Sequence, residues 1–459
     1  MMRNQSGSIL LPILAVLFII SLILTSVMIY GAWHKLQAQK AFLKLKSSYL
    51  AEAGVNKALW LLSGNDGKDI WWRTDNYQDT VHDFGRYQFS IKNWGGYIAV
   101  ESEGKVGAIM KKVRTLIGQK PDKYFSRAIN LGDPGYPLVV TGNNRIVGDV
   151  LVGPAGVMEG KFKGEGFIGT TYVDGNIITQ SNFTLPYFSE DILTEFRENI
   201  EKERKRADKM DKSLTLDDYT QSDFLKDKSL WIDGNILIRS NKPKEFLGPA
   251  FIYCSGRIEI AGMVSLGKGL ILIAEKSIAI VGQTQIRDCI LYSRGAITLK
   301  DQTLVQGQVI SEERLEVLDQ SKVSYPSVLY VKGKKDKNKI EGEMIVATKA
   351  HSEGILVYYD DSYLGKDNNF ISKNDGKISL GKNSVFSGTI YSTNYTQLEG
   401  SVIGNVSTKM FYLYFEPTTY INWLKDSFID RTRLNKEMVL PLTFGNPHKL
   451  EIAQYQELN

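Results

Sequence analysis

The hydrophobic pattern begins with a long apolar helix. Residues 4–33 contain no charged side chain, and Ile9–Trp33 is almost continuously apolar. At about 1.5 Å per residue this stretch is roughly 38 Å long, which exceeds the roughly 30 Å hydrocarbon core of a bilayer. Apolar residues then recur at helical spacing as far as Gly64, namely Leu36, Phe42, Leu45, Tyr49, Ala53, Leu59 and Leu62. We therefore expect one helix over residues 8–64, spanning the membrane first and amphipathic afterwards.

Alternation with a period of two follows the helix. Tyr87–Lys92, Tyr97–Glu101 and Val113–Ile117 alternate apolar and polar side chains, and turn residues separate them. This pattern predicts a small antiparallel sheet over residues 65–122. Its apolar face would pack on the amphipathic half of the long helix.

Short apolar triplets recur after turn residues between Trp231 and Tyr330. Their first apolar positions, at intervals of 22, 20, 19 and 18 residues, are Ile236, Ile258, Ile278, Ile297 and Leu315. A strand-only repeat of this length is typical of a β-solenoid, whose stacked coils align equivalent residues into ladders. We predict a right-handed β-solenoid over residues 123–416. An immunoglobulin-type sandwich is the alternative, since it also gives evenly spaced short strands.

A charged segment at residues 189–212 predicts a helical insertion in the solenoid. Ser189 stands where an N-cap would, and Glu190 and Asp191 follow it in the first turn, where negative charge is favourable. The charged face of this helix is expected to be solvated, with docking to a partner as the alternative.

The C-terminal segment, residues 417–459, is expected to cap the solenoid. Trp423, Leu424 and Phe428 have helical spacing, and a helix there would cover the exposed strand edges of the last coil. The predicted fold class is therefore mainly β: an N-terminal transmembrane α-helix, a small antiparallel sheet, and a right-handed β-solenoid with a helical insertion and a C-terminal helical cap.

Composition narrows the function. The 459 residues carry a formal net charge of only +5, without a long basic stripe, so we expect no nucleic-acid partner. The two cysteines, Cys254 and Cys289, are 35 residues apart, close to two coils. Two coils correspond to about 10 Å, beyond the roughly 7 Å limit for a disulfide, so we expect two free, buried thiols.

The sequence lacks recognisable catalytic motifs. No HExxH, nucleophile-elbow or phosphate-loop pattern is present, and the four histidines are scattered at His34, His82, His351 and His448. A β-helical carbohydrate-active enzyme would need clustered carboxylates. The candidates, which are more simply turn residues, are Asp217, Asp218, Asp360, Asp361 and Asp367. We expect a non-enzymatic protein without a cofactor or metal.

The N-terminus resembles a known class of signal. Residues 1–7, MMRNQSG, are short and polar, end in Gly7, and are followed at once by the apolar helix. This arrangement resembles the class III signal of type IV pilins and pseudopilins, and the later stretch Ala51–Gly54, AEAG, is similar to one in PilX-type minor pilins. The resemblance implies a leader over residues 1–7, cut between Gly7 and Ser8 by a prepilin peptidase that methylates the new N-terminus.

One position departs from that family. Counted from Ser8, the fifth mature residue is Pro12, where major pilins carry a Glu that pairs with a neighbouring subunit. Tip-located minor pseudopilins also lack this Glu, so Pro12 fits a filament tip or initiator. By the resemblance, Pro12 and Glu52 lie on the helix that meets the membrane and other subunits.

Further along the chain, the glycine-containing steps of Arg145–Val152 and Leu398–Val406 resemble bactofilins and the β-helical bodies of long PilX-type proteins.

The expected function is that of a minor pilin or pseudopilin-like subunit in the bacterial inner membrane, with its body in the periplasm or on the cell surface, at or near a filament tip. Its expected partners are a prepilin peptidase and other pilin subunits, with polysaccharide or a surface receptor as candidate ligands. The alternatives are a bitopic envelope scaffold that binds polysaccharide, and a β-helical carbohydrate-active enzyme. Four lysines after the span oppose an external body under the positive-inside rule, namely Lys35, Lys40, Lys44 and Lys46.

Overall fold

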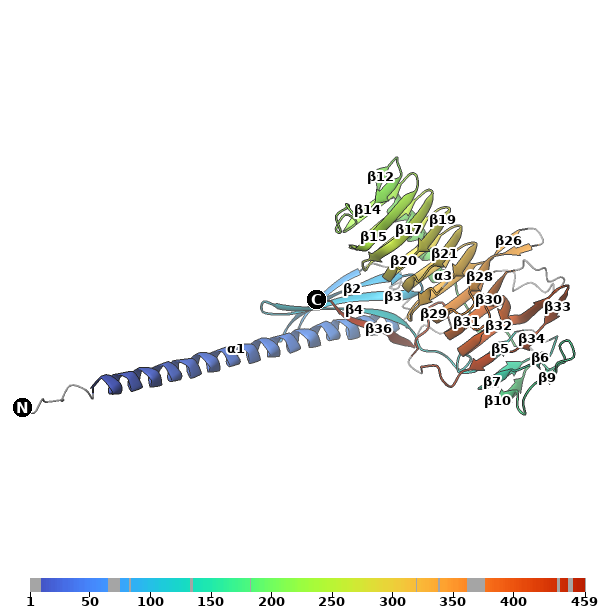
Figure 1. The fold of residues 1–459 in the computed structure, drawn as a ribbon, viewed down its shortest axis with the longest axis horizontal. Helices are drawn as coiled ribbons and strands as arrows, with labels where there is room; N and C mark the ends of the chain where they lie inside the picture. Colours follow the sequence, from blue (N-terminus) through green and yellow to red (C-terminus); the bar gives the residue numbers. More distant parts are fainter. Residues whose placement is uncertain are drawn as a thin grey trace, which may run out of the picture.

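A long helix projects from a body that consists of a small sheet and a large solenoid (Figure 1). The computed structural model describes residues 10–64, 75–81, 84–132, 135–181, 183–318, 320–336, 339–360, 376–435, 438–444 and 449–458. The predicted fold class is confirmed in its main features: the chain is mainly β, with one long N-terminal helix, a small antiparallel sheet and a large parallel sheet.

The long helix α1 (Leu10–Ser63) packs on the small sheet through its C-terminal third. The sheet is antiparallel in the order β1-β2-β3-β4-β36, with β1 (Asp75–Val81), β2 (Gly85–Trp94), β3 (Tyr97–Val106), β4 (Ile109–Gln119) and β36 (Leu450–Leu458). The predicted three-strand meander therefore exists. Its partner β36 comes from the C-terminal end of the chain, which the local sequence pattern did not indicate.

The solenoid is built from parallel strands stacked in register, and only β33 among the described strands of its large sheet pairs antiparallel, with β32. The described strands of its large sheet are β5 (Ile129–Leu131), β7 (Arg145–Val147), β8 (Val150–Val152), β10 (Val173–Asp174), β11 (Ile177–Thr179), β12 (Asp208–Met210), β13 (Leu214–Leu216), β14 (Lys228–Ile232), β15 (Ile236–Phe246), β16 (Ala250–Cys254), β17 (Arg257–Leu266), β18 (Leu270–Ala274), β19 (Ser277–Val281), β20 (Gln285–Ser293), β21 (Ala296–Lys300), β22 (Leu304–Ser311), β23 (Arg314–Val317), β24 (Lys322–Val323), β25 (Val328–Lys332), β28 (Glu343–Val346), β29 (His351–Tyr359), β30 (Lys377–Leu380), β31 (Val385–Leu398), β32 (Ser401–Phe415), β33 (Thr418–Ile421) and β35 (Phe428–Asp430). Two smaller sheets flank it, formed by β6 (Leu138–Thr141), β9 (Val157–Glu159) and β34 (Trp423–Lys425), and by β26 (Lys334–Asp336) and β27 (Lys339–Glu341).

The predicted ladder is observed residue for residue. Consecutive coils align the five predicted positions, Ile236, Ile258, Ile278, Ile297 and Leu315, and then continue through Met344 and Ile378. All seven side chains are buried in the core of the solenoid. Parallel in-register stacking excludes the sandwich alternative, whose sheets are antiparallel.

The coils do not follow one another in space as they do in sequence. The strands β5, β7 and β8, although early in the chain, stack on β32 and β35 at one end of the solenoid. The helix α3 (Asp191–Arg206) then runs along the outer face of the solenoid, and the coils resume with β12 at the opposite end (Figure 1). Each coil repeats the same local pattern, so the sequence carries no signal for this order.

The predicted C-terminal helix is wrong. Residues Thr418–Ile421, Trp423–Lys425 and Phe428–Asp430 form strands. Instead of a helical cap, the early strands β5 and β7 cover this end of the solenoid, β5 by pairing with β32 and β7 by pairing with β35. Asn422 and Asp426 have φ values of 57° and 52°, a left-handed conformation that interrupts any helix. Leu424 still points into the core, but as part of a strand.

The helical insertion is shorter than predicted. The helix begins at Asp191 and ends at Arg206, and the last predicted helical residues include strand β12. The cap position falls on Glu190, whose side chain makes no capping hydrogen bond. Ser189 still contributes, because its Oγ accepts a hydrogen bond from the Asp191 backbone N–H at 3.1 Å.

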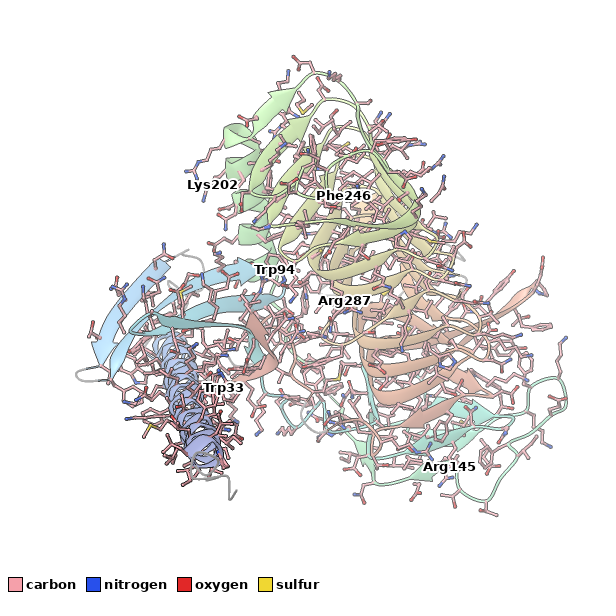
Figure 2. The ribbon with its side chains drawn as sticks, turned by 60° about the vertical axis from the view of Figure 1, so that its left-hand side comes forward. Trp33, Trp94, Arg145, Lys202, Phe246 and Arg287 are labelled. Carbon is pink, nitrogen blue, oxygen red and sulfur yellow. The ribbon has the colours of Figure 1, made fainter. Side chains whose placement is uncertain are left out.

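The sheet and the solenoid are joined by a continuous apolar cluster and a buried ion pair. The Arg114 guanidinium of β4 donates to the Asp288 carboxylate of β20 at 3.0 Å, and both side chains are less than one-tenth exposed. Asp288 lies at a bulge in β20 with φ 51°, which turns its side chain out of the coil. Arg114 also stacks on Trp94, which Figure 2 shows at the solenoid border near Arg287. We call the apolar cluster and this ion pair together the joint. The joint fixes the sheet to the middle of the solenoid.

A ladder residue should matter far more than its neighbour on the same strand. Ile260 of β17 is fully buried, whereas Glu259 pairs at 3.2 Å with Arg239 and both side chains are exposed. We expect Ile260→Ala to lower the free energy of unfolding by about 2–5 kcal/mol because it leaves a cavity. Glu259→Ala should cost less than about 1 kcal/mol. Chemical denaturation of the full chain in detergent measures both, and equal losses would contradict the ladder as the source of stability.

The joint predicts a pH-dependent cost of removing Arg114. Burial raises the pKa of Asp288 above its ordinary value of 3.8, and the charge of Arg114 opposes this rise. A carboxyl with a raised folded pKa stabilises the fold below its unfolded pKa, and this contribution is lost as the pH rises through the folded pKa. Arg114→Met removes the opposing charge. We therefore expect it to lower the free energy of unfolding more at pH 8 than at pH 5, by about 3–5 kcal/mol at pH 8.

Lys92→Met provides the matched control for Arg114→Met, because Lys92 forms an exposed 3.5 Å pair with Glu101 on the same sheet. We expect Lys92→Met to lower the free energy of unfolding by less than about 1 kcal/mol at either pH. Adding Asp288→Asn to Arg114→Met should remove the pH dependence. Denaturation curves at both pH values test this. If the loss in free energy of unfolding caused by Arg114→Met were the same at both pH values, Asp288 would not be the charge left unpaired.

Candidate functional site

The N-terminal part of α1 has no partner among the described residues. Every side chain from Leu10 to Phe42 is exposed, a helical length of about 50 Å. Within the described residues, this is one helix long and apolar enough to cross a membrane. The Thr25 and Ser26 hydroxyls each donate at 2.8 Å to the carbonyl four residues earlier, which satisfies these polar groups inside the apolar stretch.

The C-terminal part of α1 contacts the sheet through small side chains. Its buried residues recur once per helical turn, singly or as adjacent pairs, and are Ser47, Leu50, Ala51, Gly54, Val55, Ala58 and Leu62. A Cβ added to Gly104 of β3 would lie 2.1 Å from the Ser47 carbonyl oxygen, so β3 and α1 approach too closely for any side chain there. The sheet therefore selects the face of α1 that carries the smallest residues.

The large apolar side chains of this region point the other way. Phe42, Leu45, Tyr49 and Trp60 are 57%, 50%, 53% and 63% exposed. At 100° per residue they lie on one narrow face, about opposite to the sheet. We call this face the outward stripe, and it consists of Phe42, Leu45, Tyr49, Glu52, Asn56 and Trp60.

The outward stripe corrects the predicted amphipathic face. The sequence pattern placed Leu36, Phe42, Leu45 and Tyr49 on the face that packs on the sheet, but all four are at least half exposed. Helical periodicity identified an apolar stripe without indicating that the helix has two. The signal for the other face was present in Ala51, Gly54 and Ala58, whose small size permits close packing.

Glu52 is the one acidic residue of α1 and lies within the outward stripe. Its charge adds to burial in raising the pKa of Tyr455 on the neighbouring β36. Basic side chains flank the stripe: the Lys46 ammonium lies 5.0 Å from the Phe42 ring centroid, and the Lys57 ammonium lies 4.3 Å from that of Trp60. The stripe is thus apolar, with one central negative charge and a basic border.

The other predicted helix residues do not form one site with Glu52. Pro12 is exposed in the first turn of α1, where a residue needs no backbone N–H donor. It lies 40 residues before Glu52, or about 60 Å along the helix. Gly7 and Ser8 lie outside the described residues.

The candidate carboxylates of an enzyme are not brought together. Asp217 accepts hydrogen bonds from the backbone N–H groups of Tyr219 and Thr220, as a turn residue does. Asp218 accepts from the Ser240 hydroxyl, and Asp360 is buried in the separate coil of β29. Asp361 and Asp367 lie outside the described residues. Among the residues that the structure describes, no three His, Cys, Asp or Glu side chains are grouped to hold a metal ion.

Both cysteines are free and buried, as predicted. Cys254 lies on β16 and Cys289 on β20, and β18 pairs with both strands, so the two residues are two coils apart. Burial raises the pKa of both thiols, that of Cys289 to about 12. A thiol with such a pKa is almost fully protonated near neutral pH and is a poor nucleophile.

Comparison with known proteins gives a weak likeness to a pilin. No family model and no curated protein matches the sequence. Among solved structures, the crystal structure of the competence-associated pilin ComZ from Thermus thermophilus is similar over 91% of this chain and 97% of that chain, at 13% sequence identity and a TM-score of 0.21. At this TM-score the likeness establishes neither a shared fold nor a shared function.

The outward stripe should be dispensable for folding. Replacing Tyr49 and Trp60 together by Ser removes exposed side chains, so we expect the free energy of unfolding to change by less than about 1 kcal/mol. Leu62→Ala, on the sheet-facing side of the same helix, should cost about 2–5 kcal/mol. Thermal or chemical denaturation of the full chain in detergent distinguishes the two faces. A large loss in the Tyr49/Trp60 variant would mean that the stripe packs within its own subunit.

Proposed function

We propose that this chain is a non-enzymatic subunit of a type IV pilus-like filament, anchored in the bacterial inner membrane by α1 and carrying the solenoid as its head. The observation that carries the proposal is the outward stripe. It continues the exposed apolar surface of α1 beyond the membrane-spanning length, on a helix whose other face is already occupied by the sheet. A simple anchor has no need of this second surface.

Helix length supports packing against other helices. About 20 residues suffice to cross a bilayer, whereas the side chains of α1 are exposed over 33 residues, from Leu10 to Phe42. The excess length and the stripe beyond it would expose large apolar side chains to water in an isolated subunit. A bundle in which neighbouring subunits contribute their own apolar helices would cover this surface.

The size of the head favours a rare or terminal position in the filament. The 396 residues after α1 have a radius of gyration of about 21 Å if compact. Packed helices lie about 8–10 Å apart, so successive copies could not all set their helices side by side without their heads colliding. Pro12 at the fifth mature position also fits a tip subunit, which needs no carboxylate to pair with a preceding neighbour. We therefore place the chain at or near the tip, where the solenoid would serve assembly or adhesion.

A bitopic envelope protein without a filament is the second candidate. Lys35, Lys40, Lys44 and Lys46 follow the apolar span, and the positive-inside rule would put them, and the body, in the cytoplasm. Under this alternative the solenoid is a scaffold or polysaccharide-binding module. The leader would then remain uncut, which separates the two candidates experimentally.

Processing of the N-terminus tests the proposal. We expect the chain, produced in bacteria together with a prepilin peptidase, to begin at Ser8, with or without a methyl group. The measurement is intact mass combined with N-terminal peptide sequencing of the membrane fraction. Cells without the peptidase are the control and should retain the full leader. A chain that keeps its initiator methionine in the presence of the peptidase would favour the bitopic envelope protein.

A further inference from the structure

The two ends of the solenoid differ in how well they close its interior. One end is the coil of β12 and β13, and the other is the coil of β10 and β11 (Figure 1). At the β12 end, the interior residues Leu214 and Leu216 are 8% and 1% exposed, and Leu225 of the following loop is fully buried in the same core. The apolar ladder is therefore closed at the β12 end.

At the β10 end an interior ladder ends in the open. Ile177 of β11 pairs with Val150, and Val150 pairs with Ile129, and the latter two are fully buried in the core. Ile177 occupies the same interior position, yet its side chain is 42% exposed, because no further coil covers it among the described residues.

Only part of the β10 end is covered by its own side chains. Phe167 and Tyr172, whose rings meet edge-on at 5.7 Å, pack against the core, and Val173 of β10 is buried. Ile168 stays 66% exposed and Ile177 remains uncovered beside it in the same coil. The β10 end thus presents apolar side chains that a complete cap would bury.

The strand edges at the β10 end carry almost no charge. β10 and β11 pair with β7 and β8 on one side, and neither pairs with a described strand on the other side. Residues 166–181 hold a single charged side chain, Asp174, whose carboxylate lies 3.5 Å from the guanidinium of Arg145, labelled at this end in Figure 2. Exposed edge strands usually carry charges that prevent pairing with another chain, and this edge lacks that protection.

The closed β12 end has the usual protection. The charged side chains of residues 206–218 are Arg206, Asp208, Lys209, Asp211, Lys212, Asp217 and Asp218. The chain therefore protects one end of the solenoid with charge and a closed core, and leaves the other end free to pair.

We propose that two copies of this chain associate through their β10 ends as a two-fold symmetric dimer. A second coil end covers the strand edges and the open interior together, whereas a single extended segment would cover only one side of the coil. The partner surface is the same end of the second copy, because the β12 end is closed and charged. Such a contact uses one patch twice, as a two-fold interface does.

The direction of α1 is compatible with this dimer. The stack of coils runs across the direction of α1 (Figure 1). A two-fold axis perpendicular to the stack can therefore lie along α1, so that both copies insert their helices into the same membrane. With sides of about 10–17 Å, the end of one coil offers far less area than the roughly 800 Å² per partner of a standard interface. The dimer is therefore weak in solution, and a shared membrane favours it by raising the effective concentration.

Sedimentation velocity of the full chain in density-matched detergent tests this inference. We expect a reversible equilibrium between monomer and dimer with a Kd in the micromolar range. Ile177→Lys should weaken dimerisation roughly tenfold or more, because it buries a charge in the contact. Its side chain is already partly exposed, so the variant should fold. Thr215→Lys, at an exposed position of the terminal strand β13, is the matched control and should leave the Kd unchanged.

Crosslinking locates the contact. A photo-crosslinking residue at Ile177, in a mixture of unlabelled and nitrogen-15-labelled chains, should join the two copies through residues 166–181. The same residue at Tyr219, near the β12 end, should not join them. Replacing Tyr49 and Trp60 by Ser should leave the dimer intact, which separates this contact from any association through α1.

A second variant keeps the test decisive if Ile177→Lys does not fold. Ile168→Lys changes a more exposed side chain of the same coil and should also weaken the dimer. The inference is overturned if the chain stays monomeric up to about 200 µM, far above a micromolar Kd. It is also overturned if the folded variants dimerise as tightly as the unsubstituted chain, or if the Tyr49 and Trp60 replacement abolishes the dimer. None of these outcomes changes the expected cleavage of the leader.

Discussion

The close contact between α1 and the small sheet is the constraint on which the rest of the structure depends. Small residues on α1, together with Gly104 on β3, allow helix and sheet to touch backbone to backbone. That packing fixes the rotation of the helix about its own axis. The apolar span consequently projects away from the body (Figure 1), and the outward stripe lies on the face of α1 about opposite to the sheet.

The sheet transmits this orientation to the solenoid. One apolar cluster runs from α1 through the sheet to the outer face of the solenoid, and the Arg114–Asp288 pair lies buried within the joint. The C-terminal segment strengthens it, because Gln119 and Leu440 exchange backbone hydrogen bonds before β36 enters the sheet. The helix, the sheet and the outer face of the solenoid therefore share one apolar cluster, while the interior of the solenoid forms a second.

Local periodicity predicted the solenoid well because each ladder residue repeats the same burial. The positions from Ile236 to Leu315 could be aligned from spacing alone, and the free thiols followed from that alignment. Where the coil pattern changed, the prediction failed. The span around Trp423 has helical spacing, yet left-handed residues on either side of β34 keep it in strands.

Long-range order was beyond the reach of sequence patterns. Nothing local distinguishes an early coil stacked at the far end, such as β5, from one that follows in sequence. The same holds for β36, whose partner β4 lies more than 300 residues earlier. In the candidate site, periodicity revealed apolar residues on α1 but not their division between two faces, which depends on the sheet. The open end at β11 had no sequence signature either, because residues 166–181 repeat the coil pattern without marking it as the last of the stack.

We expect the outward stripe to pack against the helix of another subunit. A photo-crosslinking residue at Tyr49, introduced into the full chain in cells that assemble filaments, tests it most directly. Tyr219, which is 95% exposed at the far end of the solenoid, is the matched control position. We expect a crosslink from Tyr49 to the apolar helix of a second pilin-like subunit and none from Tyr219. Crosslinks from Tyr49 to lipid alone, or to its own body, would contradict it.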